Sequence, residues 1–77
     1  MSKQNAETSN YTINVRVGPM TTATGSMRDV MEQEAMNQAL VVAAEYRDKG
    51  RTARVYVYRA GDSVPVAMYR SMDEVAA

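Results

Sequence analysis

The spacing of apolar residues predicts a first β-strand near the start of the chain. Between Tyr11 and Val17 every second residue is apolar and the residues between them are polar, which is the period of a strand with one buried face. Gly18-Pro19 follows, and proline cannot donate a hydrogen bond to a neighbouring strand. We therefore expect the strand to end there and residues 20–25 to form a loop.

Two more alternating runs predict a β-hairpin in the second half of the chain. The runs Thr52–Ala60 and Val64–Arg70 are rich in β-branched and aromatic residues. Gly61-Asp62 separates them, with glycine at the first position of the turn, as a type II′ turn requires. The pairs that such a turn predicts are Val57 with Val66, Val55 with Met68, Tyr56 with Ala67 and Arg54 with Tyr69.

Between the first strand and the hairpin, the sequence predicts a long helix from about residue 27 to residue 49. Ser26-Met27-Arg28-Asp29 matches a capping box, and Gly50 stands where a helix commonly ends. At about 100° per residue, one face collects the apolar residues Met31, Ala35, Met36, Ala39, Val42, Ala43 and Tyr46. Because three of them are alanines, we expect the helix to pack closely against the sheet. Leu40 and Val41 fall outside this face.

The predicted order is strand, helix, strand, strand, which indicates an α+β fold. We expect a three-stranded antiparallel sheet (β-α-β-β) covered on one face by one long helix. The last strand is expected between the other two, because all neighbours then run antiparallel, and the alternative is a position at the edge of the sheet. Residues 1–10 are polar and without periodicity, so we interpret them as a flexible N-terminal tail and residues 11–77 as a single domain. Ser71-Met72-Asp73-Glu74 matches a second capping box, with room for one helical turn after it.

The amino-acid composition excludes several kinds of catalytic and metal-binding site. The chain of 77 residues has no histidine and no cysteine, so imidazole and thiolate chemistry are excluded, as are disulfides. The carboxylate pairs Asp29 with Glu32 and Asp73 with Glu74 fit helix starts better than acid–base catalysis. We therefore expect a protein that is not an enzyme and has no metal ligand and no cofactor. With no signal peptide and no apolar stretch that could span a membrane, we expect it in the cytoplasm, without membrane contact.

One face of the predicted sheet carries residue types that are enriched in binding sites. If the helix covers the valine-rich face, the uncovered face displays tyrosine and arginine, which dominate the energetics of many interfaces. An open antiparallel face is also furnished with these residues for strand propensity alone. The partner-binding residues that we predict are Arg16, Arg54, Tyr56, Tyr58 and Tyr69. The alternative binding site is the segment Met20–Ser26, which the pattern predicts as a loop.

A local cluster of positive charge suggests a second function. Nine Lys and Arg balance nine Asp and Glu over the whole chain, so the net charge is zero. Between residues 46 and 59, however, the chain has five cations, one acid and three tyrosines. Aromatic rings beside cations suit single-stranded nucleic acid. The nucleic-acid-binding residues on this hypothesis are Arg47, Lys49, Arg51, Arg54 and Arg59. A third hypothesis is a structural homodimer, joined through an exposed sheet edge or through Leu40 and Val41.

The layout of the chain resembles that of the anti-CRISPR proteins, small inhibitors of bacterial CRISPR-Cas complexes that phages and mobile elements encode. The similar parts are Tyr11–Val17, Glu34–Tyr46 and Arg54–Tyr69. The resemblance is one of architecture and carries no shared motif, so it implies no particular functional residue. It implies a non-catalytic inhibitor that acts in the bacterial host cell by docking on a CRISPR-Cas effector complex. Because the chain is neutral whereas many of these inhibitors are acidic, protein docking is favoured over mimicry of nucleic acid.

Overall fold

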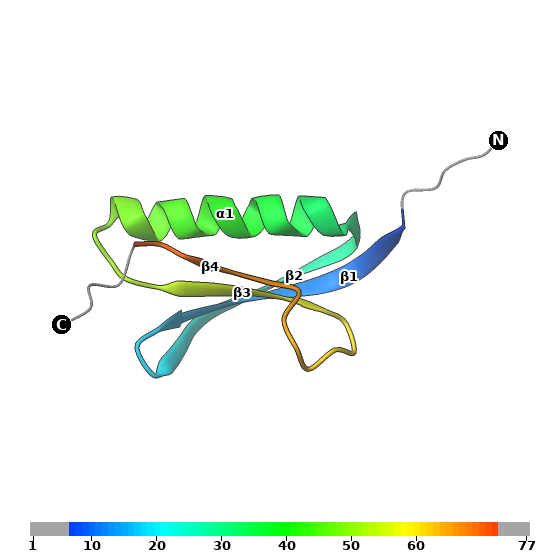
Figure 1. The fold of residues 1–77 in the computed structure, drawn as a ribbon, viewed down its shortest axis with the longest axis horizontal. Coiled ribbons are helices and arrows are strands. Elements are labelled where there is room, and N and C mark those ends of the chain that lie inside the picture. Colours follow the sequence, from blue (N-terminus) through cyan, green and yellow to red (C-terminus); the bar gives the residue numbers. More distant parts are fainter. Residues whose placement is uncertain (1–6, 73–77) are drawn as a thin grey trace.

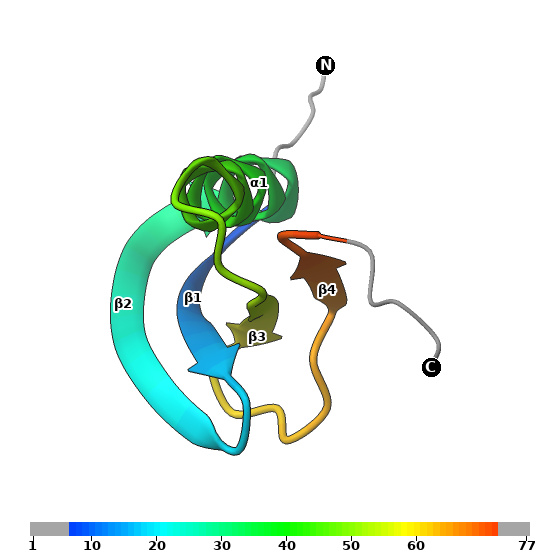
Figure 2. The same ribbon diagram turned by 90° about the vertical axis from the view of Figure 1, so that its left-hand side faces the viewer.

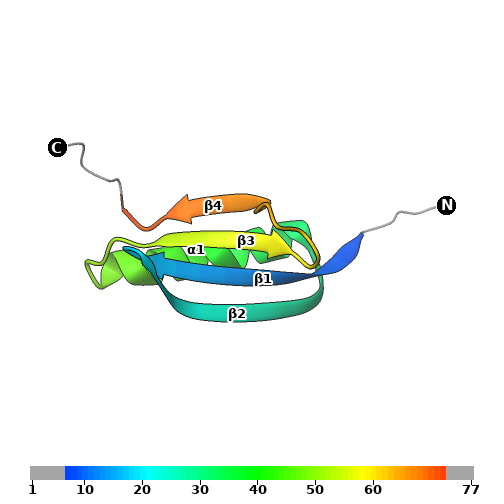
Figure 3. The ribbon, with the colours of Figure 1, turned by 90° about the horizontal axis from the view of Figure 1, so that it is seen from below.

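Two antiparallel hairpins and one helix make up the fold (Figure 1). A computed structural model describes residues 7–72. The elements are β1 (Thr8–Val17), β2 (Met20–Met31), α1 (Glu32–Asp48), β3 (Arg54–Arg59) and β4 (Ala67–Arg70). The strands form one antiparallel sheet in the order β2-β1-β3-β4. Helix α1 covers one face of this sheet and leaves the other uncovered (Figures 2 and 3). The predicted α+β class is confirmed, but the sheet has four strands rather than three.

The additional strand is β2, which the sequence pattern predicted as a loop and the start of the helix. Gly18-Pro19 does not end the sheet; it is the two-residue turn of the hairpin, because Val17 pairs directly with Met20. Gly18 has a φ of 63°, and a positive φ followed by the fixed φ of proline suits a type II′ turn. Residues 20–26 are all exposed. A strand that buries neither side chain set shows no apolar period, and this is why the pattern missed it.

Helix α1 begins at Glu32, five residues after the predicted start. Met31 is its N-cap and makes no side-chain capping bond. Asp29, predicted as the last residue of a capping box, instead lies in an irregular part of β2 with a φ of 57°. Its backbone N–H donates to Asn10 Oδ1 (2.9 Å), and its Oδ1 accepts from Thr8 Oγ1 (2.6 Å). Partners on β1, distant in sequence, therefore replaced the local capping interaction.

The core is a thin layer of small side chains between α1 and the sheet. Three alanines of the helix are almost fully buried, and they face residues of β1 and β3. The buried set is Tyr11, Ile13, Val15, Ala35, Ala39, Ala43, Ala53, Val55 and Val57. The alanines of the predicted apolar face are thus buried in the core, which agrees with the expected packing of the helix against the sheet. Leu40 and Val41, outside the predicted face, remain 48% and 51% exposed.

Strand order and hairpin register both differ from the expectation. Among the three predicted strands, β3 rather than the last strand lies between the other two, and β2 occupies the other side of β1. Since β2 and β3 both run antiparallel to β1, they are parallel to each other, and α1 is the crossover that joins them. In the second hairpin Val57 pairs with Ala67, and β4 starts only after Pro65. The register is thus shifted by one residue, which turns each β4 side chain to the opposite face.

The ends of the domain differ from the predicted boundaries or lie outside the described residues. Strand β1 begins at Thr8, so residues 8–10 of the predicted tail belong to the sheet, while residues 1–6 lie outside the described residues. The predicted helical turn after Ser71 falls largely on residues 73–77, also outside them. Ser71 itself is buried. Its Oγ accepts from the N–H of Ala53 (2.7 Å) and donates to the carbonyl of Arg51 (2.7 Å), which fastens the end of β4 beside the start of β3.

Candidate binding face

A row of three arginines crosses the uncovered face of the sheet. Arg16 on β1 pairs with Arg54 on β3, and Arg54 pairs with Arg70 on β4. Directly paired residues share a face, and adjacent strands lie about 4.8 Å apart, so the three arginines project from backbone positions that span about 10 Å. All three side chains are exposed. The strands that carry them lie side by side when the sheet is viewed from its uncovered side (Figure 3).

Two tyrosines lie beside this row. The rings of Tyr56 and Tyr58 are stacked, with centroids 6.3 Å apart and an interplanar angle of 29°. Both side chains are half-buried, and both are on β3 with Arg54. Tyr56 pairs with Asn14 on one side and with Met68 on the other. Alternation along one central strand therefore places an arginine and two aromatic rings on one surface, one after the other.

No acidic side chain occupies a described position of this surface, which we name the open face. Its remaining positions on β1 and β2 are polar and uncharged, because Thr24 and Ser26 of β2 pair with Asn14 and Thr12. The opposite layer has the reverse charge, since α1 contains four acids and one base. The open face consists of Thr12, Asn14, Arg16, Thr24, Ser26, Arg54, Tyr56, Tyr58, Met68 and Arg70. Among the described residues, the open face therefore carries positive charge and the helix negative charge, although the net charge of the whole chain is zero.

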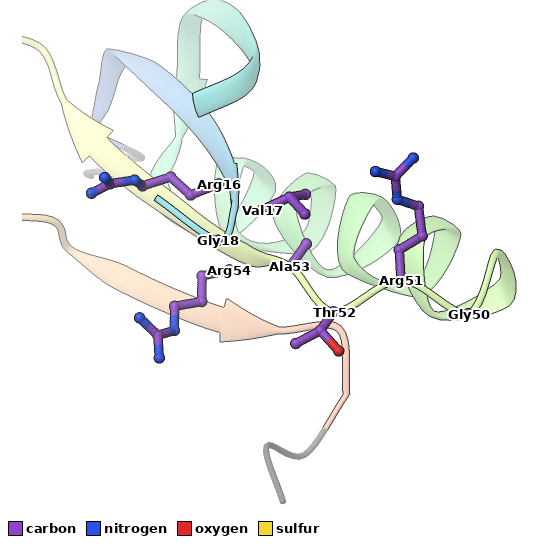
Figure 4. A pocket seen from close by; sticks show the side chains of 8 residues that line it. All are labelled: Arg16, Val17, Gly18, Gly50, Arg51, Thr52, Ala53 and Arg54. Carbon is purple, nitrogen blue, oxygen red and sulfur yellow. The ribbon is translucent and has the colours of Figure 1, made fainter. Parts of the chain in front are cut away.

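A cleft of about 650 Å³ opens at the arginine end of the sheet. It lies between the β1–β2 turn and the connection from α1 to β3, both of which bend at a glycine with positive φ, Gly18 and Gly50. Arg16 and Arg54 extend in the same direction at its wall, whereas Arg51 points away from both (Figure 4). A guanidinium N–H of Arg16 also donates to the carbonyl of Pro19 (3.1 Å), which orients this side chain over the turn.

The structure brings four of the five predicted partner-binding residues together. Arg16, Arg54, Tyr56 and Tyr58 all belong to the open face. Tyr69 does not: it pairs with Val55 and packs against the core beneath α1. Arg70 and Met68 take its place, and the sequence reasoning missed both because it assumed a two-residue turn. Pro65 was the available signal, since a proline that cannot donate indicates that the strand begins after it.

The predicted nucleic-acid-binding cluster is not one patch. Arg54 alone lies on the open face, and Arg59, an odd number of positions later on β3, faces the helix side. A guanidinium N–H of Arg59 donates to Glu32 Oε1 (2.9 Å). The guanidinium carbon Cζ of Arg59 lies 6.0 Å from the centre of the Tyr11 ring. Hydrogen bonding and electrostatic interaction with the Tyr11 side chain and, to a smaller extent, electrostatic interaction with the Glu32 carboxylate raise the pKa of the Arg59 guanidinium above its ordinary value.

The other cations of that cluster surround the end of the helix. Arg47 is exposed in the last turn of α1, and the Lys49 ammonium lies 5.6 Å from the centre of the Tyr46 ring. The alternative site, Met20–Ser26, is the exposed first part of β2 rather than a loop. Strand alternation and the helix end thus separate residues that are neighbours in sequence.

Comparison with known proteins identifies no family for this chain. No family model, curated protein or solved structure matches the chain. Within residues 7–72, no group of three or more carboxylate, imidazole or thiol side chains is arranged to hold a metal ion. In the same part of the chain, no helix combines the length and apolar character needed to cross a membrane.

Proposed function

We propose that this protein is a non-catalytic binding protein that uses its open face to bind single-stranded nucleic acid. The observation that carries the proposal is the row of Arg16, Arg54 and Arg70 beside the stacked pair of Tyr56 and Tyr58. Cations that meet phosphates and rings that stack on bases are the two components of single-strand recognition. A surface whose described positions hold no acidic side chain adds no repulsion against a polyanion.

The spacing of these side chains supports an oligonucleotide whose bases lie along β3. Phosphates at one end of the oligonucleotide would follow the arginine row across the start of β3, and the bases beyond them would lie against Tyr56 and then Tyr58. Stacking of a base on an aromatic side chain contributes about 1 to 3 kcal/mol. Three phosphate contacts predict that the logarithm of the affinity falls with the logarithm of the salt concentration with a slope of about −2.

The experiment is a fluorescence anisotropy titration of a labelled, mixed-sequence DNA or RNA oligonucleotide at several salt concentrations. We expect affinity to fall roughly fifteenfold between about 50 and 200 mM salt. Arg54→Ala should weaken binding and reduce the slope by about 0.7. Arg47→Ala is the matched control, because it removes an exposed cation of the helix. Equal losses in both variants would show nonspecific attraction and would contradict the proposed face.

A second candidate is an inhibitor that docks on a protein surface of a CRISPR-Cas complex. One observation favours it: Met68, 39% exposed, lies beside Tyr56 on the open face, and an apolar side chain among tyrosine and arginine is typical of protein interfaces. Phage plating on a host with an active CRISPR-Cas system tests this candidate. Rescue of plating by the protein, lost with Met68→Asp but kept with Val64→Asp in an exposed connection, would favour the inhibitor.

A further inference from the structure

The two edges of the sheet differ in how they resist pairing with another strand. The edge strand β4 has four residues, follows Pro65 and ends in an arginine. Short length, proline and charge are the usual protections of an edge. The edge strand β2 has 12 residues, and from Met20 to Met27 it contains neither a charge nor a proline. No strand among the described residues pairs with its outer side.

The regular part of β2 is the segment Ala23–Met27. The register of β1 with β2 is irregular on both sides of it, between Val15 and Arg16 and again between Ser9 and Tyr11. Within the segment, Thr24 and Ser26 belong to the open face. Ala23, Gly25 and Met27 are on the helix side, where a groove of about 460 Å³ separates β2 from α1.

This groove is apolar at its base. Ile13 and Val15 of β1 form its floor, and Val42 and Tyr46 of α1 form its wall. The groove exists because alanine and glycine supply most of the β2 side. An added strand beside β2 would therefore gain two things: backbone hydrogen bonds along the edge and apolar surface on the helix side.

We propose that a second copy of the chain pairs antiparallel with this edge, with Gly25 on the twofold axis. In this register Gly25 pairs with itself, and the segment becomes complementary to itself, as a twofold contact requires. The larger Met27 of each copy lies opposite the small Ala23 of the other on the helix side. Thr24 lies opposite Ser26 on the open face, and paired hydroxyl side chains stabilise antiparallel strands.

Charge does not oppose pairing with a second copy. The paired segments carry no charge, so no like charges meet across the axis. The groove rim contains one acid, Glu45 of α1, and one base, Lys49, which follows the last residue of α1. Two identical rims therefore carry no net charge with which to repel each other. A five-residue ladder is about 17 Å long and one sheet about 10 Å thick, and this small area predicts a weak, concentration-dependent dimer.

Such a dimer would join the two sheets into one and place both helices on the same side. The two open faces would then be continuous, with an arginine row toward each end. The inference does not depend on what the open face binds, because its tests measure only the association of the protein with itself.

The first test is sedimentation equilibrium of the wild-type chain and of Gly25→Lys over roughly 10 to 500 μM. A Cβ added at Gly25 meets nothing within 4 Å, and Gly25 has no positive φ, so the variant should fold, as circular dichroism would verify. In the dimer, however, the two new lysines face each other, and we expect the dissociation constant to rise at least about tenfold. Val64→Lys, at a position that is 72% exposed and distant in sequence from β2, is the control. Equal association of wild type and Gly25→Lys would overturn the proposal, as would a monomer at every concentration.

The second test uses the absence of cysteine from the chain. In Gly25→Cys, the two thiols would lie on directly paired residues, whose Cα atoms are about 4.5 to 5.5 Å apart, within the range of a disulfide. We expect mild oxidation to give a covalent dimer much faster than with Val64→Cys, measured by nonreducing electrophoresis at equal concentration. Equal rates for the two variants would show random collision and would exclude Gly25 from the axis, leaving the edge to a foreign strand.

Discussion

The two faces of the sheet are made by the same strands but differ in composition, burial and charge. The face beneath α1 carries buried valine, isoleucine and tyrosine side chains, which pack against the alanines of the helix. The open face carries three arginines, two half-buried tyrosines and several hydroxyl groups. In a domain of 77 residues, stability is small. Because one face supplies most of it, the other can be occupied by large polar side chains with little loss of stability. Stability and binding should therefore respond to different substitutions.

The largest effect is expected on the covered face of the helix. Ala39 is fully buried, and Ala39→Asp would place a carboxylate without a partner between α1 and the sheet, at a cost of about 4 kcal/mol or more. Thermal unfolding monitored by circular dichroism should show a chain that is largely unfolded. Val41→Asp, on the exposed side of the same helix, should change stability by less than about 0.5 kcal/mol. A folded Ala39→Asp variant would refute the assignment of the core.

The next prediction tests the two tyrosines that the hairpin register places on opposite faces. Tyr69→Ala should lower the free energy of unfolding by about 2 kcal/mol through lost core contact and leave the affinity of the folded protein unchanged. Tyr56→Ala should do the reverse: stability changes little, and affinity for the oligonucleotide falls about tenfold or more. Urea unfolding and anisotropy measure the two quantities. If the results are exchanged between the variants, the pairing of β4 with β3, which is shifted by one residue from the predicted register, is wrong.

A smaller effect is expected where β2 bends toward the helix and connects the two layers. Asp29→Ala keeps the positive φ of this residue and removes the hydrogen bond from Thr8, which should cost about 1 to 2 kcal/mol. Asp29→Asn retains an acceptor oxygen and a side chain that tolerates this conformation, so its cost should stay within about 0.5 kcal/mol. Equal midpoints of urea unfolding for the two variants would show that the contact is unimportant.

The smallest effect concerns the ion pair on the covered side. The Arg59 and Glu32 side chains are 43% and 44% exposed, and a pair so accessible to solvent contributes little to stability. Glu32→Gln should therefore lower the midpoint of urea unfolding by less than any destabilising variant above, and added salt should remove the difference. Oligonucleotide affinity should not change, since neither residue belongs to the open face. A clear loss of affinity would mean that the binding surface extends around the sheet.

By itself, the sequence determined the elements that have a strong period. Alternation identified β1 and β3, and the alanine-bearing face identified α1, because burial on one side leaves a regular apolar trace. The same alternation correctly predicted that Arg16, Arg54, Tyr56 and Tyr58 share one face. These are local consequences of a period of two residues, and they do not depend on which strands are neighbours.

Only the tertiary structure decided the features that depend on partners distant in sequence. Strand β2 leaves no apolar trace because its first part is exposed on both sides, and it becomes a strand only by pairing with β1. The position of β3 between β1 and β4 then aligns Arg16, Arg54 and Arg70, which lie far apart in the chain. Hydrogen bonds between strands set this register, and a shift of one residue exchanges the two faces of a strand. The arginine row is therefore a product of strand pairing, since no local pattern in the sequence encodes it.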